Sequence, residues 1–361
     1  MTRDPKQLTE RAIGITALVV AGLGPLLFNN YWVDAILTQM LIVGIAAASL
    51  IFLAAYGGMI SLAQTALAGT AGFILGNMVT KGGEGGETKG LALGWDPTLS
   101  LVLAIVGTVL IGLFFGAIAS RSTGIYFLMI TLTFSVIGFY FVGQVTVVSG
   151  FSGIGSVNEH TPGFVGDMVN DRYRLYYISL GVALAIYVAI RLIVRTPFGL
   201  SLQGVRDEPV RMSSLGYAVP LHRTLAFGLA AFFAALSGVL LVWWQGQIAP
   251  GDVGLPATID LLIVAVIGGL TRVEGAWIGA LAFIVISNYV RDSWLTQLLD
   301  DVHIGGSFNT IIGLIFLLIV IVSPDGLVGL WDRLWGRFQR RTDSGIPVAP
   351  VSPTGTIAGE V

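Results

Sequence analysis

Residues able to perform covalent, acid–base or metal chemistry are few in this chain. The three histidines, His160, His222 and His303, lie far apart, so no pair has the spacing of ligands to one metal ion. Cysteine is absent from the 361 residues, which excludes disulfides, thiol nucleophiles and cysteine-ligated metals. The sequence also lacks a Gly-x-x-x-x-Gly-Lys-Ser/Thr loop for nucleotide phosphates. We therefore predict no catalytic residue, no metal site, no cofactor and no ATPase site of its own.

One glycine-rich stretch could instead bind a small solute through backbone and side-chain dipoles. Gly57 and Gly58 precede Ser61, Gln64 and Thr65. Glycines let backbones approach closely, and interrupted membrane helices often bind solutes near the bilayer midplane. The alternative is that each polar side chain only forms a hydrogen bond between helices. As a group, these five residues are our first candidates for a translocation path.

A second glycine pair, Gly268 and Gly269, lies at a comparable place in the C-terminal half. We add both residues to the path candidates. The two pairs suggest an internal repeat of five plus five spans.

The segment 195–223, RTPFGLSLQGVRDEPVRMSSLGYAVPLHR, is polar and basic and lies between apolar runs. We expect a short helix over 204–215, ended by Gly216 in the left-handed conformation that glycine favours. Its charged and apolar residues would suit docking of a soluble partner, whereas an ordinary solvated loop is the alternative. The residues considered for docking are Val205, Arg206, Asp207, Glu208, Arg211, Leu215 and Gly216.

The elements that must hold these residues are membrane helices. Hydrophobic residues make up 55% of the chain and charged residues 11%, with a mean hydropathy of +0.84. Soluble domains carry about 25% charged residues, whereas a charge at mid-membrane costs about 3 kcal/mol on insertion scales. We predict an all-α, polytopic membrane protein. Its net charge of −2 gives no basis for binding nucleic acid.

About ten stretches are apolar enough to cross a membrane, which takes about 20 residues. They are 11–28, 34–55, 61–79, 98–119, 124–146, 175–194, 223–244, 257–271, 275–291 and 307–323. The third and eighth are glycine-rich or short, so we expect broken or re-entrant helices near 57–79 and 257–271. The first is interpreted as an uncleaved span, because no clear signal-peptide cleavage site follows it. Residues 1–341 would form a single transmembrane domain and 342–361 a disordered cytoplasmic tail.

Basic residues set the expected orientation. With both termini in the cytoplasm, only five of the 19 Lys and Arg residues fall outside, in agreement with the positive-inside rule. The five are Lys81, Lys89, Arg172, Arg174 and Arg291. The spans have almost no ionisable residue at depth, which argues against a proton-coupled secondary carrier.

Four stretches, in the right order, resemble the LivM type of branched-chain amino acid ABC permease over roughly residues 33–330. They are YGGMISLAQ (56–64) with Gly69 and Gly72; TGIYFLMITL (123–132); PFG (197–199), VRD (205–207) and LG (215–216) of the polar segment; and VIGGL (266–270) followed by GAWIGA (275–280). The chain departs from the family pattern at Arg211 and Met212, which replace small residues, at Gln64, and at 149–151.

The resemblance implies a multi-pass permease subunit of an ATP-driven importer in the plasma (inner) membrane. Residues 206–216 would be the coupling helix that docks on a cytosolic ATPase. The expected partners are a second, homologous permease, two ABC ATPases that hydrolyse the ATP, and an extracytoplasmic solute-binding protein. Branched-chain amino acids are the expected solutes. A urea or short-chain amide permease of the same family and, outside it, a stand-alone secondary carrier are the alternatives.

Overall fold

The computed structural model describes most of the helical part of the chain. The described residues are 21–27, 29, 31–80, 90–163, 165–166 and 172–291, with 313–314, 316–317, 321 and 326–329. The expected tail 342–361 lies outside them, as does most of the expected spans 11–28 and 307–323.

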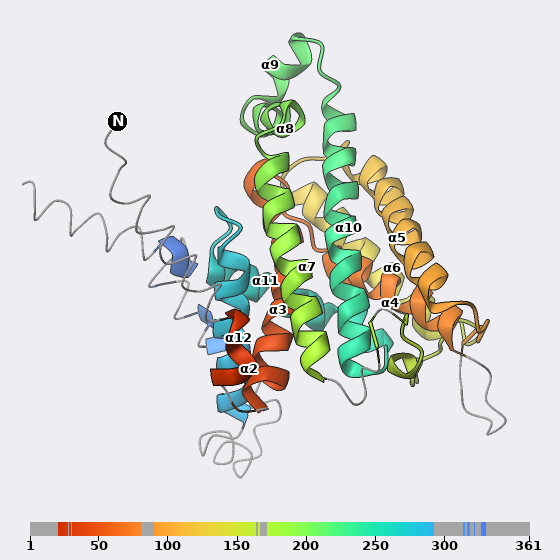
Figure 1. Cartoon of the computed structure of the whole chain (residues 1–361). Helices are drawn as coiled ribbons and strands as arrows, with labels where there is room; N and C mark the ends of the chain where they lie inside the picture. The colour runs from red at the N-terminus through yellow and green to blue at the C-terminus, as the bar shows by residue number, and fades with distance from the viewer. Residues whose placement is uncertain are drawn as a thin grey trace, which may run out of the picture.

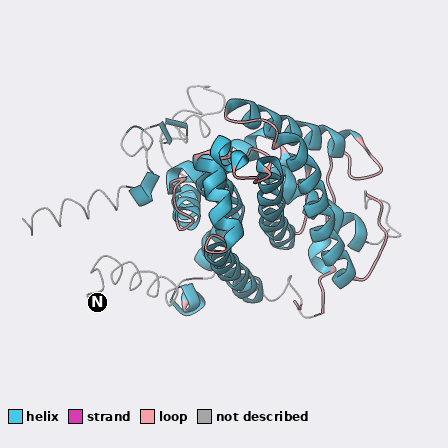
Figure 2. Cartoon of the chain, turned by 90° about the horizontal axis from the view of Figure 1, so that it is seen from above, coloured by secondary structure: helices cyan, strands magenta, loops and turns pink. Residues whose placement is uncertain are grey.

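The described residues are helical, as predicted (Figure 1). The α-helices are α2 (Gly24–Leu27), α3 (Gln39–Gly57), α4 (Gln64–Val79), α5 (Pro97–Ala119), α6 (Ile125–Gln144), α7 (Arg172–Ile193), α8 (Pro197–Asp207), α9 (Pro209–Ser214), α10 (Val219–Gln245), α11 (Leu255–Gly268) and α12 (Gly275–Arg291). A π-helical turn, η1 (Trp32–Thr38), leads into α3, and short 3-10 turns are η2 (Val157–Glu159) and η3 (Pro250–Val253). Figure 2, viewed from the end at which α8 and α9 lie, shows no strand in the described part of the chain. An isolated antiparallel bridge joins Ile154 to Ile248.

Five of the described helical segments are long and apolar enough to cross a membrane. They are Trp32–Gly57, Pro97–Ala119, Ile125–Gln144, Tyr173–Ile193 and Val219–Gln245. Two shorter apolar helices, Leu255–Gly268 and Gly275–Tyr289, accompany them. The described fold is therefore that of a multi-pass membrane protein.

The helices α3 and α10 form the centre of the bundle. In their most apolar windows 78% and 72% of the residues are buried, against 22% for α5 and 28% for α6 and α7. Helix α10 also packs closely on α4, where Gly238 of α10 lies against the Ala68 carbonyl of α4. A Cβ added at Gly238 would overlap that oxygen. Small residues thus let these membrane helices pack backbone to backbone.

Both segments in which we expected interrupted helices contain a short helix. Helix α3 ends at Gly57, Gly58 follows with φ +65°, and α4 begins only at Gln64, three residues later than the predicted start at 61. Helix α4 has 16 residues and α11 has 14, both below the length of about 20 that spans a bilayer. The non-helical residues 58–63 and the η3 turn precede these two helices.

Candidate functional site

The helices α4 and α11 begin side by side. The hydroxyl oxygens of Thr65, in the first turn of α4, and Thr258, in the first turn of α11, are 2.7 Å apart. Ser135 of α6 lies 3.0 Å from the same Thr258 oxygen and donates to the Val253 carbonyl at 3.2 Å. Thr258 in turn donates to the Gly254 carbonyl at 3.2 Å. Three segments that are far apart in sequence therefore meet in one hydroxyl cluster, which we define as Thr65, Ser135 and Thr258.

The hydroxyl cluster lies about halfway along α6. Ser135 is ten residues after Ile125, the first residue of this 20-residue helix, and a rise of about 1.5 Å per residue places it roughly 15 Å along the axis. The first N–H groups of a helix have no carbonyl partner within it. Accordingly, the backbone N–H groups of Gln64 and Thr65 have no hydrogen-bond partner among the described residues. The cluster thus combines hydroxyls with unpaired N–H groups at a level about halfway along α6.

The predicted path residues around the start of α4 are buried and close to the hydroxyl cluster. Ser61 accepts a hydrogen bond from the Ala63 N–H at 3.2 Å, and the Leu62 N–H donates to Thr131 of α6 at 3.1 Å. Gln64 is fully buried, and its Oε1 atom lies 3.0 Å from the Ser49 hydroxyl of α3. The Gln64 Nε2 atom has no hydrogen-bond partner among the described residues. One polar atom of this buried amide therefore lacks a partner among the described residues.

The glycine pairs lie elsewhere. Gly268 packs against the backbone of Gly275, so that α11 and α12 pack closely at this point. Gly268 is ten residues beyond Thr258, roughly 15 Å along α11. The structure therefore does not bring Gly268 and Gly269 to the hydroxyl cluster, and Gly57 and Gly58 lie at the end of α3 near α8.

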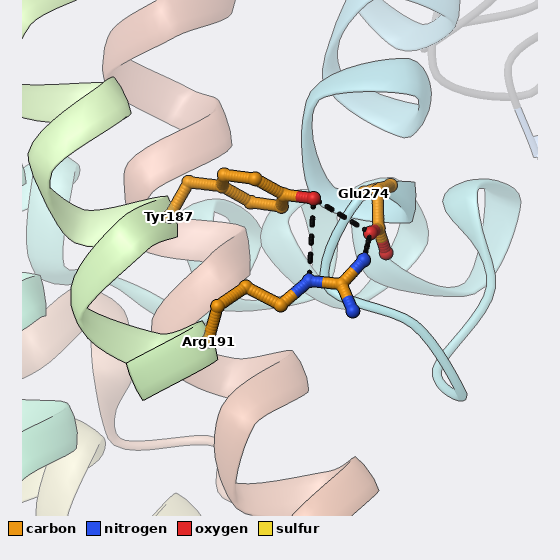
Figure 3. Close-up of polar contacts among 3 residues, drawn as sticks. All are labelled: Tyr187, Arg191 and Glu274. Carbon is orange, nitrogen blue, oxygen red and sulfur yellow. Dashed lines mark hydrogen bonds and ion pairs between the residues drawn. The ribbon is translucent and has the colours of Figure 1, made fainter. Parts of the chain in front are cut away.

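A polar network joins α7 to the turn between α11 and α12 (Figure 3). The Tyr187 hydroxyl donates to Glu274 Oε1 at 2.9 Å and accepts from Arg191 Nε at 3.2 Å. Arg191 also forms an ion pair with Glu274. The sequence places Arg191 and Glu274 near the same predicted membrane face, but it does not reveal that they pair across 83 residues.

The predicted docking helix over 204–215 is wrong in two respects: the segment forms two helices, and the first begins at Pro197, seven residues before the predicted start. Helix α8 ends at Asp207, Glu208 leaves the helical region with φ −141°, and α9 begins at Pro209. A proline disfavours the helical conformation in the residue before it, which explains the break. Gly216 has φ +90°, the left-handed conformation that the sequence predicted.

The predicted docking residues divide between two environments. Val205 is fully buried, and Arg206 donates a hydrogen bond to the Ala55 carbonyl in α3. Arg206 Nε also donates to Asp207 at 2.7 Å, which holds the pKa of that carboxyl below its usual value. In contrast, the apolar side chains of Val210 and Leu215 are 77% and 67% exposed. Arg206, Asp207, Glu208, Arg211 and Gly216 are exposed as well, so Val205 is the one buried residue of the predicted docking set.

Sequence reasoning missed Thr258, which links α4, α6 and α11. The available signal was weak: a threonine two residues after Pro256, in the first turn of an apolar helix. Ser135 and Ser49 are polar residues in predicted spans, but nothing in the sequence singles them out as partners of the α4 residues.

Comparisons with known proteins agree with this architecture. The family model for the permease component of the branched-chain amino acid transport system matches residues 32–322. The probable branched-chain amino acid transport permease LivH of Methanocaldococcus jannaschii is 25% identical over 181 residues, 48% of this chain and 51% of that protein. Escherichia coli LivM, a high-affinity branched-chain amino acid permease protein, is 25% identical over 118 residues, 33% of this chain and 28% of its own length.

The corresponding permease protein BraD of Pseudomonas aeruginosa is 31% identical over 137 residues, 38% of this chain and 41% of that protein. The chain thus spans about half of these relatives or less. No solved structure matches it. Because the family model covers most of the sequence, this chain belongs to the family of branched-chain amino acid transport system permease components.

Proposed function

We propose that this chain is the membrane-spanning permease subunit of an ATP-binding-cassette importer for branched-chain amino acids. The observation that carries the proposal is the exposed helix α9, placed beyond the end of α7 together with α8 (Figure 1). A stand-alone carrier needs no such element, whereas a permease driven by separate ATPase subunits needs a surface on which they dock.

The docking surface that we propose consists of Glu208, Val210, Arg211 and Leu215. No residue of α9 is buried, and the large side chains of Val210 and Leu215 are exposed between charged neighbours. We propose that these two exposed apolar side chains, flanked by Glu208 and Arg211, contact the partner. Two ABC ATPases would bind here and on the matching surface of a second, homologous permease, and they would hydrolyse the ATP. Gly216 ends the helix and turns the chain towards α10.

The translocation path that we propose passes the first turns of α4 and α11. Free N–H groups and the positive ends of helix dipoles favour the carboxylate of an amino acid. Ser61, Gln64 and Thr65 would contribute from the α4 side, joined by Thr258 and Ser135 of the hydroxyl cluster. Transporters commonly place solute sites at such helix ends near the midplane. Gly57 and Gly58 would form the entry to this stretch, and Gly268 packs against Gly275, the first residue of α12.

The topology that we propose has about ten crossings with both termini in the cytoplasm. α4 and α11 are then the interrupted segments, 1–341 is one transmembrane domain, and 342–361 is a cytoplasmic tail. This orientation places α8 and α9 on the cytoplasmic side, where an ATPase can reach them. An extracytoplasmic binding protein would deliver the solute at the opposite face of the plasma (inner) membrane.

Co-purification tests the proposal. The tagged chain, expressed in its host, should retain two ABC ATPase subunits and a second permease after solubilisation in mild detergent. Val210→Asp with Leu215→Asp should lower the amount of retained ATPase at least tenfold. The matched control is Val147→Asp. Val147 is 64% exposed, but it follows the C-terminal end of α6 and is not part of the α8–α9 segment. A wild-type chain that purifies without any ATPase contradicts the proposal.

A further inference from the structure

The side chain of Arg206 connects α8 to the end of α3. Its guanidinium donates to the Ala55 carbonyl in the last turn of α3 and, through Nε, to Asp207 at 2.7 Å. Its aliphatic part covers Gly58, where an added Cβ would lie 2.6 Å from the Arg206 Cγ atom. The Arg206 side chain is 36% exposed. Two of its contacts, with Ala55 and Gly58, hold it against the bundle, and the third is with the next residue of its own helix.

This arrangement suits an internal link better than a docking contact. The last carbonyls of a helix lack partners within it, and a cation near them interacts favourably with the helix dipole. Arg206 therefore satisfies the Ala55 carbonyl at the place where α3 stops. These bonds use two of the five N–H donors of the guanidinium, one on Nε and one on Nη1.

Helix α8 is anchored to the bundle by buried side chains, whereas α9 has no buried residue. Leu202 and Val205 of α8 are almost fully buried, and α8 packs on both α3 and α10. No residue of α9 is buried, and α9 rests on α8 through Met212, whose sulfur would lie 2.9 Å from a Cβ at Gly204. Helix α9 also contacts α10, so a movement imposed on α9 from outside would reach α10 directly and α3 through α8.

The contact of Arg206 with Gly58 indicates which segment would move with α8. Gly58 opens the non-helical segment 58–63, and this segment runs directly into Gln64 and Thr65 at the start of α4. A short stretch of chain thus separates Arg206 from the hydroxyl cluster.

We propose that Arg206 is the positioning residue that transmits movement of the α8–α9 segment to the start of α4. The inference rests on the proposed function and assigns to Arg206 a role other than binding the ATPase. Loss of the Arg206 side chain should leave the ATPases attached and active but should separate hydrolysis from transport.

The test uses the full importer in proteoliposomes and measures leucine uptake and ATP hydrolysis on the same sample. Arg206→Ala should retain ATPase subunits within about twofold of the wild type and lower leucine uptake per ATP at least tenfold. Arg206→Lys should recover part of that ratio, because an ammonium group can still donate to the Ala55 carbonyl. Arg195→Ala is the matched control, since Arg195 is an exposed arginine of the same segment, and it should leave the ratio unchanged.

A purely structural role for Arg206 would lower the amount of assembled importer but not uptake per ATP. If the importer with Arg206→Ala does not assemble, Gly58→Ala tests the same contact. Its added Cβ displaces the Arg206 side chain and strains a residue at φ +65°. The inference is overturned if leucine uptake per ATP is unchanged in whichever of these variants assembles. It is also overturned if Arg206→Ala selectively loses the ATPases. A wild-type importer without ATP-dependent uptake would instead refute the proposed function, so the two failures are distinguishable.

Discussion

Replacing Thr258 by valine tests whether the hydroxyl cluster serves transport or only holds helices together. The change keeps the branched shape of the side chain and removes its hydroxyl. Valine cannot form the hydrogen bonds that Thr258 shares with Thr65 at 2.7 Å and with Ser135 at 3.0 Å. Ser135 keeps its bond to the Val253 carbonyl, so Thr65 is the residue that loses its partner.

The cost to stability follows from the kind of bond. Hydrogen bonds between membrane helices contribute about 0.6 kcal/mol each on average, so removing two of them costs about 1 kcal/mol. Folded proteins have about 5–15 kcal/mol of stability, and such a decrease leaves nearly every molecule folded. If the cluster binds the solute, uptake should nevertheless fall at least tenfold, which corresponds to about 1.4 kcal/mol in the transport barrier.

The assay compares leucine uptake in proteoliposomes with thermal unfolding in detergent. Thr108→Val is the matched control, because Thr108 is equally buried but donates only to Ala104 of its own helix, at 2.8 Å. We expect similar small shifts in the unfolding temperature for both variants and a large loss of uptake only for Thr258→Val. Uptake within twofold of the wild type in Thr258→Val refutes the assignment of the cluster to the path.

Three further predictions concern the packing. The chain has no native cysteine, so Thr65→Cys with Thr258→Cys should form a disulfide on mild oxidation. Proteolytic cleavage of the chain between α4 and α11 should then leave two fragments joined by this disulfide. If both thiols react fully with a labelling reagent but no joined fragments form, the two helices do not begin together. Gly238→Ala should destabilise the bundle by about 1–3 kcal/mol through overlap with α4, whereas Gly181→Ala, with open space around it, should leave unfolding in detergent unchanged. Glu274→Gln should lower stability by about 1 kcal/mol or less, because its ion pair is partly exposed; a drop of several kcal/mol in a denaturant titration would contradict this.

The sequence was sufficient for the class of fold because membrane composition is a property of the whole chain. The glycine-rich sequence near 57–79 predicted a broken or re-entrant helix; the structure has the end of α3 at Gly57, the non-helical residues 58–63 and the short, continuous helix α4, and whether α4 crosses the membrane stays a prediction. The start of α4 at Gln64 depends on packing and could only be placed approximately.

The contacts that define the site could not be predicted in the same way. Thr65 and Thr258 are 193 residues apart, and the helical pattern says nothing about which first turns meet. Arg206 was expected to face a partner because charged residues on a polar loop usually face water. Its actual neighbour, Ala55, lies 151 residues away. Pro209 was ambiguous as well, because proline both ends one helix and suits the first turn of the next.

Leucine uptake by proteoliposomes with and without ATP is the decisive measurement for the permease assignment. The liposomes would contain this chain with its co-purified permease and ATPase subunits, the binding protein on the outside, and ATP or a non-hydrolysable analogue inside. We expect concentrative uptake only with hydrolysable ATP, and no such uptake when Val210 and Leu215 are both replaced by aspartate. Equal uptake without ATP, or by the chain alone, would refute an ATP-driven permease, and ATP-driven uptake of urea or acetamide but not leucine would refute the proposed solute.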